Sequence, residues 1–279
     1  MVYNFLFYLI TDYPMKLTLI ITTYNWPDAL LAVIESVKNQ SILPNEVIIA
    51  DDGSLNDTRD LITRLKSNSI LNIIHIWQED KGFRASRSRN NAISRSSGDY
   101  IVLVDGDTIL HPEFVKDHIA NAELGFFVQG YRVLLSQKAT IKTLAEKKIN
   151  FSFFSSGLSN RKNCLHSKFL SSIFSNQKNH LAGIKSCNMA FYRKDSININ
   201  GFNNEFEGWG REDSEFVVRL MNSGVNRKNV RFNAIQFHLW HNENSTISLV
   251  RNDVMLNDAI INKVKWCTNG INSIETDES

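Results

Sequence analysis

The 279-residue sequence predicts an α/β fold with an open, mostly parallel sheet flanked by helices. Three observations favour this fold. Short apolar runs rich in β-branched residues alternate with helical patterns from position 17 to about 130. The runs are apolar throughout, which is typical of parallel strands that are covered on both faces. The composition, 43% hydrophobic and 22% charged, is that of a folded globular chain.

The alternation begins with five expected strands and three expected helices. The strands are the apolar runs 17–24 (LTLIITTY), 46–51 (EVIIAD), 71–76 (LNIIHI), 100–105 (YIVLVD) and 126–130 (FFVQG). A helix is expected to begin at Pro27, because four apolar residues between 30 and 37 recur at helical spacing. Two more helices are expected around 61–65 and after Pro112. This order is that of βαβ units, whose sheets bind ligands beyond the carboxyl ends of their strands.

Positions 132–185 differ from the rest of the chain in charge. Ten basic residues and one acidic residue, Glu146, give this segment a net charge of +9, whereas the whole chain carries +2. Apolar residues at helical spacing (141, 144, 145 and 149) and five phenylalanines interleave with the cations. Two interpretations stay open: a solvated, partly ordered insertion, or a surface that meets anionic lipid head groups or a charged acceptor. No nucleic-acid-binding motif is present, so nucleic acid is not an expected partner.

The second half of the sequence is expected to complete one catalytic unit. It holds a strand pattern at 188–192, a turn-rich loop at 201–210, a helical pattern at 212–221 and a further strand pattern at 230–241. Three cysteines, Cys164, Cys187 and Cys267, are too few and too widely spaced for a disulfide framework or a zinc site. A reducing compartment is therefore expected.

The first 14 residues carry the apolar run 5–10 (FLFYLI), which is far shorter than the roughly 20 residues that span a bilayer. No transmembrane helix is expected. The opening residues show neither the basic region nor the cleavage site of a signal peptide. Met15 directly precedes the first expected strand and is a candidate start, which would make 1–14 an upstream extension.

Candidate metal ligands follow the strand 100–105. Asp105 and Asp107 flank Gly106 directly after this buried run, at the sheet edge where ligands bind. Carboxylate oxygens suit Mg²⁺ or Mn²⁺, and the glycine lets a diphosphate approach the backbone. The sequence has no Gly-x-x-x-x-Gly-Lys loop and no complete dinucleotide fingerprint, so a metal is the expected means of neutralising phosphates. A solvated turn is the alternative.

A second acidic group follows Trp209. Glu212, Asp213 and Glu215 fall in the first turn of an expected helix, where the helix dipole alone favours acids. Trp209 lies between two glycines, and its aromatic face suits a sugar ring. A carboxylate beside such a ring could take a proton from a sugar hydroxyl.

His238 and His241 lie three residues apart in the last expected strand. Residues at that spacing point to opposite faces of a strand, so a metal is expected to take only one of them. Spacing alone does not distinguish a ligand from a structural histidine in an apolar strand.

Polar residues also follow the first two strands and the third, at the same sheet edge. Tyr24 and Asp52 could recognise a base by stacking and hydrogen bonding, although Asp-Gly-Ser is also a common turn sequence. Arg84, Arg87 and Arg89 could hold a diphosphate bidentately or form surface ion pairs.

Together these stretches resemble the family 2 glycosyltransferases with the GT-A fold, over about positions 16–243. Four blocks in the family's order carry the likeness: IITTYN, VIIADDGS, DKGFRASRSRN and GDYIVLVDGD. The segment GFNNEFEGWGREDSEFVVRL is similar to the carboxy-terminal segment of β-1,4-galactosyltransferases and of bacterial chondroitin-polymerase-type enzymes. The fold that the likeness implies is a single Rossmann-like nucleotide-sugar domain with a C-terminal acceptor-side part.

The resemblance also implies a role for each matching residue. Asp107 matches the main metal ligand, with Asp105 supporting it on the donor side, and His238 matches the residue that completes a Mn²⁺ or Mg²⁺ site. Asp213 matches the catalytic base. The other matching positions are Thr22, Tyr24, Asp52, Arg84 and Arg89 for the donor, and Trp209 and Glu212 for the acceptor.

Five regions are expected along the chain. These are an N-terminal extension (1–15), a nucleotide-sugar-binding half (16–131), a basic insertion that faces the acceptor or a membrane (132–185), an acceptor-side catalytic half (186–245) and a C-terminal tail (246–279). The expected activity is inverting, metal-dependent transfer of a hexose-type sugar (Gal, GalNAc, Glc or GlcNAc) from a UDP-sugar to a glycan or lipid-linked glycan. The expected setting is bacterial surface polysaccharide or lipopolysaccharide synthesis in the cytoplasm, with peripheral contact to the inner membrane.

Two absences and two alternatives bound this expectation. The processive signature Gln-x-x-Arg-Trp is missing and only one Asp-x-Asp follows a suitable strand, which disfavours a self-extruding or two-site polymerase. A non-catalytic carbohydrate- or nucleotide-sugar-binding module is the alternative from another class. A sugar-phosphate nucleotidyltransferase is disfavoured, because the segment after the first strand, TTYNWPDA, has no glycine.

Overall fold

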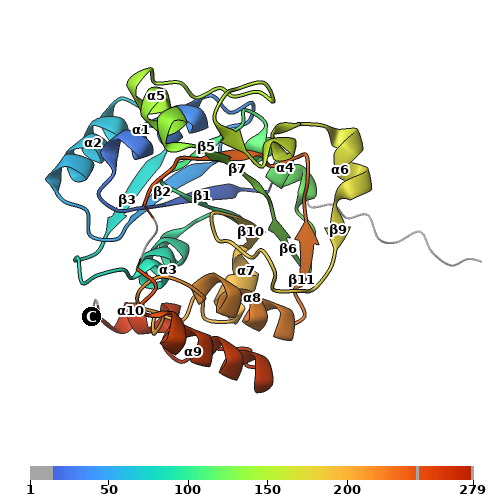
Figure 1. Cartoon of the computed structure of the whole chain (residues 1–279). Helices are drawn as coiled ribbons and strands as arrows, with labels where there is room; N and C mark the ends of the chain where they lie inside the picture. The colour runs from blue at the N-terminus through green and yellow to red at the C-terminus, as the bar shows by residue number, and fades with distance from the viewer. Residues whose placement is uncertain (1–14, 243–244, 278–279) are drawn as a thin grey trace, which may run out of the picture.

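The computed structural model of the chain describes residues 15–242 and 245–277 (Figure 1). The expected extension, its apolar run and the first methionine lie outside the described residues, whereas Met15 is partly buried against the core. No helix in the described ranges combines the length and the apolar character that crossing a bilayer requires.

The larger sheet has eight strands among the described residues, in the order β3-β2-β1-β4-β10-β6-β11-β9. They are β1 (Leu17–Thr23), β2 (Glu46–Asp51), β3 (Ile73–Trp77), β4 (Tyr100–Asp105), β6 (Phe126–Gln129), β9 (Asn176–Gln177), β10 (Asn188–Tyr192) and β11 (Asn226–Asn229). The first four run parallel, and β10 is antiparallel to both of its neighbours, β4 and β6. The predicted open, mostly parallel sheet is confirmed, as are the five strands of the first half.

A second sheet carries part of the candidate site. Its order is β5-β12-β7-β8, from β5 (Thr108–Leu110), β12 (Gln236–His238), β7 (Arg132–Leu135) and β8 (Leu158–Ser159). The strand expected over 230–241 was wrong in its extent, because only Gln236–His238 is extended. Phe232 and Ala234 adopt positive φ angles of 60° and 51°, which interrupt an extended backbone.

Ten α-helices and one short 3₁₀ helix lie in the described ranges. They are α1 (Pro27–Lys38), α2 (Asn56–Ser67), α3 (Ala85–Arg95), α4 (Phe114–Asn121), α5 (Gln137–Ala145), η1 (Arg161–Cys164), α6 (Lys168–Phe174), α7 (Arg193–Asn198), α8 (Glu212–Asn222), α9 (Leu249–Ile261) and α10 (Ile271–Asp277). The three helices expected in the first half and the helix at 212–221 are confirmed. In the basic segment, α5 ends at Ala145, so Ile149 of the expected helical pattern lies beyond it.

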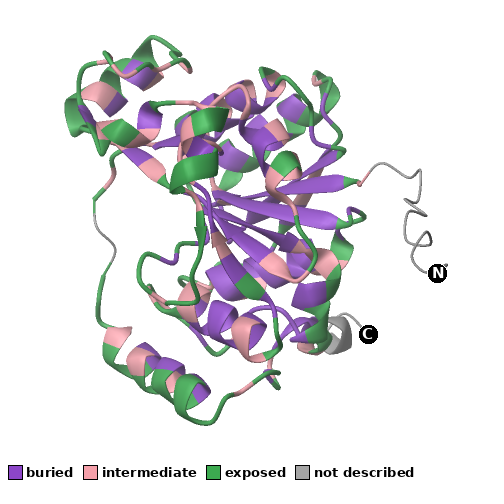
Figure 2. Ribbon diagram, turned by 90° about the vertical axis from the view of Figure 1, so that its right-hand side faces the viewer, coloured by how far each residue is buried: buried purple, intermediate pink, exposed green. Residues whose placement is uncertain are grey.

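Helices cover both faces of the larger sheet, which explains why its strands are apolar throughout (Figure 2). Leu19 and Ile21 of β1 pack in one core with α1, α2 and α4. The residue between them, Ile20, packs in the other core with α3, α8 and α10. Alternation along β1 therefore divides its side chains between two fully buried layers.

The segment 246–277 packs on α8 and on the second core. Leu256 and Ala259 of α9 contact Val218 of α8, and Ile271 of α10 belongs to the second core. The region named as a tail thus contains two packed helices.

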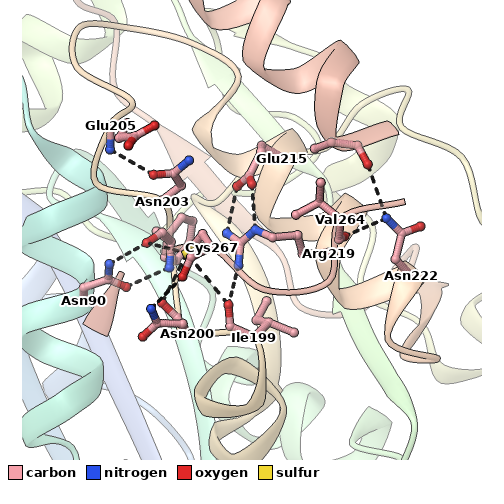
Figure 3. A network of polar contacts seen from close by, with 12 residues as sticks. Asn90, Ile199, Asn200, Asn203, Glu205, Glu215, Arg219, Asn222, Val264 and Cys267 are labelled. Atoms are coloured by element: carbon pink, nitrogen blue, oxygen red, sulfur yellow. Dashed lines mark hydrogen bonds and ion pairs between the residues drawn. The ribbon is translucent and has the colours of Figure 1, made fainter. Parts of the chain in front are cut away.

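A buried polar network fixes the loop that leads into α8 (Figure 3). Arg219 donates to both carboxylate oxygens of Glu215, at 2.6 and 2.7 Å, and to the carbonyl of Ile199 at 2.7 Å. Asn90 of α3 exchanges two hydrogen bonds with the backbone of Phe202, at 2.7 and 2.8 Å. These contacts hold the first turn of α8 in a defined position against α3.

Candidate active site

The candidate site begins where three parallel strands end. The register pairs Thr22 of β1 with Ala50 of β2 on one side and with Asp105 of β4 on the other. The carboxyl ends of these strands therefore bring Thr22, Asp52 and Asp105 to one edge of the sheet, as parallel pairing requires. The side-chain oxygen Oγ1 of Thr22 is buried and has no hydrogen-bond partner.

Asp107 faces two histidines, His238 at the end of β12 and His241 three residues later. Its Oδ2 lies 3.3 Å from Nε2 of His241 and 3.6 Å from Nε2 of His238. The ligand atoms of these three residues all lie within 4.8 Å of one another. The strand alternation on which the expectation of a single ligating histidine rested does not extend to His241, because β12 ends at His238.

The chemistry of this trio fits a divalent cation. Oδ1 of Asp107 is buried and has no hydrogen-bond partner. Burial and the positive charge of Arg132 together lower the pKa of His238 to about 4, so its imidazole is neutral and can donate a lone pair. Burial raises the pKa of Asp107 to about 6, opposed by His241 and Arg132. A carboxylate and two imidazoles suit Mn²⁺ and related divalent ions.

Arg89 links the two acidic groups that the sequence singles out. This buried side chain on α3 places Nη1 3.3 Å from Oε1 of Glu212 and Nη2 3.6 Å from Oδ1 of Asp105. Its guanidinium also lies over the Phe202 ring, 5.5 Å from the centroid. The arginine that was expected to hold a diphosphate is thus already paired with two carboxylates.

Asp213 lies in the first turn of α8, next to that ion pair. Burial and the neighbouring Glu212 raise its pKa to about 7, against the opposing charge of Arg89. Ser214 Oγ donates to Oδ1 of Asp213 at 3.2 Å. The structure therefore holds a carboxylate that exchanges its proton near neutral pH, a property typical of a general base.

The two residues expected on the acceptor side differ in exposure. Trp209 is 43% exposed, whereas Glu212 is 8% exposed and its carboxylate faces Arg89. Gly208 and Gly210 adopt φ angles of 75° and 104°, which favour glycine, and so let the loop turn sharply on either side of the tryptophan. Trp209 is therefore accessible to a ligand, whereas the carboxylate of Glu212 is held by Arg89.

The residues expected to bind the nucleobase form a hydrogen-bonded cluster at the ends of β1 and β2. Asp52 accepts from Nε2 of Gln78 at 2.5 Å and from the backbone N–H of Arg84 at 2.8 Å. Tyr24 is half exposed, and its hydroxyl donates to Oδ2 of Asp80 at 2.9 Å. The Arg84 guanidinium donates to the carbonyl of Glu79.

Three residues that the sequence analysis did not assign to the site lie in it. Gln78 and Asp80 hydrogen-bond to Asp52 and Tyr24, the two residues expected to bind the nucleobase, and His241 completes the trio around Asp107. The spacing of the two histidines carried no signal for this, because the outcome depends on where β12 ends. Arg132 was counted only as part of the basic segment.

Two family models match the chain. The first, "Glycosyl transferase family 2", matches residues 18–199. The second, "N-terminal domain of galactosyltransferase", matches residues 169–242 and so includes Trp209, Asp213 and both histidines. The two matches together cover the whole of the candidate site.

Two curated relatives are bacterial proteins that are much longer than this chain. The hyaluronan synthase of Pasteurella multocida is 30% identical over 232 residues, which are 75% of this chain and 23% of that protein. The chondroitin synthase of Escherichia coli is 27% identical over 256 residues, which are 81% of this chain and 36% of that protein. The chain thus spans about a quarter to a third of the length of these relatives.

Solved structures share the fold. TarS from S. aureus, in complex with UDP, has a TM-score of 0.61 and 16% identity over 89% of this chain and 66% of that chain. The mannosyltransferase PcManGT from Pyrobaculum calidifontis, in complex with GDP-Man and Mn²⁺, has a TM-score of 0.55 and 15% identity over 81% of this chain and 57% of that chain. These two matches support the expected GT-A fold.

Both histidines are expected to contribute to metal binding. His241→Ala and His238→Ala should each weaken Mn²⁺ binding at least about tenfold, because each removes one nitrogen ligand beside Asp107. Isothermal titration with MnCl₂ measures the affinity, and His180→Ala, at an exposed histidine away from the trio, is the control. Unchanged Mn²⁺ affinity in His241→Ala would show that His241 is not a metal ligand.

Proposed function

The chain belongs to glycosyl transferase family 2, and from that premise we propose that it transfers a hexose-type sugar from a UDP-sugar to a carbohydrate hydroxyl, with inversion. The donor sugars that we consider are Gal, GalNAc, Glc and GlcNAc. The names of the relatives, hyaluronan synthase and chondroitin synthase, support a role in polysaccharide synthesis in bacteria. The acceptor would be a glycan or a lipid-linked glycan.

One observation carries this proposal. The ion pairs of Arg89 with Asp105 and Glu212 join the end of β4 to the start of α8. Charge interactions connect Arg89 to Asp213 and connect Asp105 to Asp107 and His238. A candidate base and a candidate metal trio that are distant in sequence therefore belong to one charged cluster.

In the proposed reaction, the acceptor oxygen attacks the anomeric carbon from the face opposite the diphosphate. The new carbon–oxygen bond forms as the bond to the phosphate oxygen breaks, and UDP departs with that bonding electron pair. Asp213 takes the acceptor proton, and its pKa near 7 suits this role at neutral pH. The half-exposed Trp209 would stack on a sugar ring and orient the attacking hydroxyl.

Asp107, His238 and His241 would hold Mn²⁺ or Mg²⁺, with Asp105 supporting them. When bound, the cation supplies positive charge that stabilises the departing diphosphate by several kcal/mol. Thr22, Tyr24 and Asp52 would bind the uridine, since the unpartnered Thr22 hydroxyl and the exposed Tyr24 ring are both at the strand ends. Arg84 lies on this side of the cluster, where its backbone already orients Asp52.

The five regions expected from sequence also remain a proposal. Residues 16–131 would bind the donor and residues 186–245 the acceptor, with 246–277 buttressing α8. A binding module without catalysis is the alternative, and it would bind a UDP-sugar without releasing UDP. Hydrolysis of UDP-sugars in the presence of Mn²⁺, followed over a panel of sugars, separates the two and identifies the donor.

The basic segment 132–185 would contact an anionic membrane surface. Large apolar side chains on it are exposed, among them Phe154 (87%), Phe169 (73%) and Ile173 (57%). Cations that are interleaved with exposed aromatic rings are typical of surfaces that bind anionic lipid head groups. A lipid-linked acceptor and a cytoplasmic, peripheral location would follow from such contact.

Asp213→Asn is expected to lower transfer about 10²- to 10⁴-fold, since the amide cannot take the acceptor proton. UDP affinity should be unchanged, because the amide still fits the space of the carboxylate. Burial and Glu212 raise the pKa of Asp213, so its ionised form destabilises the fold above pH 7 and the variant should have a higher Tm at pH 8. Transfer at the wild-type rate by this variant would remove Asp213 as the base.

The pH dependence of kcat/KM should report the same carboxylate. Transfer needs Asp213 without its proton, so kcat/KM should be constant above about pH 8 and fall about tenfold per unit below about pH 7. Measurements of the initial transfer rate at saturating Mn²⁺, over about pH 5.5 to 9, would record this fall. A constant kcat/KM down to pH 5.5 would contradict a base with this pKa.

Membrane contact is tested by flotation with liposomes. The protein should float with vesicles that contain anionic lipid at low salt and should dissociate at high salt, as electrostatic attachment requires. Phe169→Ser should weaken flotation, whereas Ile70→Ser, at an equally exposed residue outside the segment, should not. Absence of flotation with anionic vesicles at low salt would exclude this contact.

A further inference from the structure

Arg132 is the first residue of β7 and shares a sheet face with His238. In the parallel pairing of β7 and β12, Arg132 lies beside Gln236, and Leu134 lies beside His238. Val133, Leu135 and Phe237, which alternate with these residues, pack in a hydrophobic core. The side chains of Arg132 and His238 therefore project from the opposite face, toward the metal trio.

The guanidinium of Arg132 has little to bind in the protein itself. Its Nη1 donates to Sγ of Cys187 at 3.9 Å, and sulfur is a weak acceptor. No carboxylate in the described part of the chain forms an ion pair with this half-buried side chain. A guanidinium offers five N–H donors, so most of its capacity is left for a ligand.

The charge of Arg132 acts on the metal trio. It opposes the rise in the pKa of Asp107 and lowers the pKa of His238. The buried oxygen Oε1 of the neighbouring Gln236 has no hydrogen-bond partner, and neither has Oδ1 of Asp107. Unused polar groups therefore gather on this side of the trio.

A departing diphosphate needs more positive charge than the other arginines offer. Asp105, Asp107 and Asp213 are acids that repel it, and Arg89 is already paired with two carboxylates. Arg84 donates to the carbonyl of Glu79, beside the residues expected to bind the nucleobase. Of the arginines in contact with the site, Arg132 is the one that faces the metal trio and has no acidic partner among the described residues.

We propose that Arg132 binds the diphosphate of the donor and stabilises the charge that forms on departing UDP. This inference rests on the proposed function, because it takes a nucleoside diphosphate as the ligand. Arg132 donates hydrogen bonds to phosphate oxygens and forms no covalent bond. An anionic acceptor group could meet the same guanidinium instead, and in that case Arg132→Gln would bind UDP as the wild type does.

The test compares uridine, UMP and UDP as ligands of Arg132→Gln and Arg132→Lys. We expect Arg132→Gln to raise the Kd for UDP about ten- to a hundredfold and to leave the Kd for uridine unchanged, because uridine carries no phosphate. Arg132→Lys should lie between this variant and the wild type, since a lysine retains charge without bidentate geometry. Arg161→Gln, at a half-buried arginine of the same basic segment, is the matched control and should bind UDP as the wild type does.

Isothermal titration with Mn²⁺ and again with EDTA separates a direct from an indirect effect. The loss of UDP affinity should persist in EDTA, and thermal melting verifies that each variant is folded. The proposal is overturned if Arg132→Gln binds UDP as tightly as the wild type, or if the loss appears only with Mn²⁺, which would mean that Arg132 acts through the metal ligands. A wild-type protein that binds no UDP would instead overturn the proposed function.

Discussion

A buried guanidinium, that of Arg89, joins the two halves of the site. It pairs with Asp105 at the end of β4 and with Glu212 at the start of α8. Arg89 and Glu212 are 123 residues apart in the sequence. Removing one partner of a buried ion pair leaves an uncompensated charge, at a typical cost of about 3–5 kcal/mol. The position of α8 against the sheet edge, and with it that of Asp213, therefore depends on this contact.

Burial of so many acids around one arginine has an electrostatic consequence. The pKa of Asp107 is raised to about 6 and that of Asp213 to about 7, in each case mainly by burial. The first of these acids lies beside two imidazoles, and the second follows the exposed Trp209 in the chain. One cluster thus offers a place for a cation and a place for a proton, which are the two requirements of metal-assisted transfer to a hydroxyl.

The sequence was sufficient to predict the sheet, because β1, β2 and β4 are buried on both faces and so are apolar throughout. It was also sufficient to predict that Asp105 and Asp107 lie at the ligand-binding edge. It did not predict α3, because most of the residues that this helix buries are polar, among them Ser86, Ser88 and Asn90, and only three are apolar. Hydrophobic periodicity gives little signal for a helix whose buried side chains are mostly polar.

The site residues that were missed depend on tertiary pairing. Whether His241 joins His238 is decided by where β12 ends, and the backbone reversals at Phe232 and Ala234 shorten that strand. The basic composition of its segment does not distinguish Arg132 from the nine other cations there. Its distinction comes from the register with Gln236, which no single-sequence pattern contains.

The central claim is that Asp107 and Asp213 serve one reaction from two sides of one bound donor. A crystal structure with Mn²⁺ and a non-hydrolysable UDP-sugar, with the cation located by anomalous scattering, tests it most directly. We expect the cation between Asp107, His238 and His241, and the anomeric carbon between the cation and the carboxylate of Asp213. A donor bound with its anomeric carbon turned away from Asp213, or a cation bound elsewhere, would contradict the account.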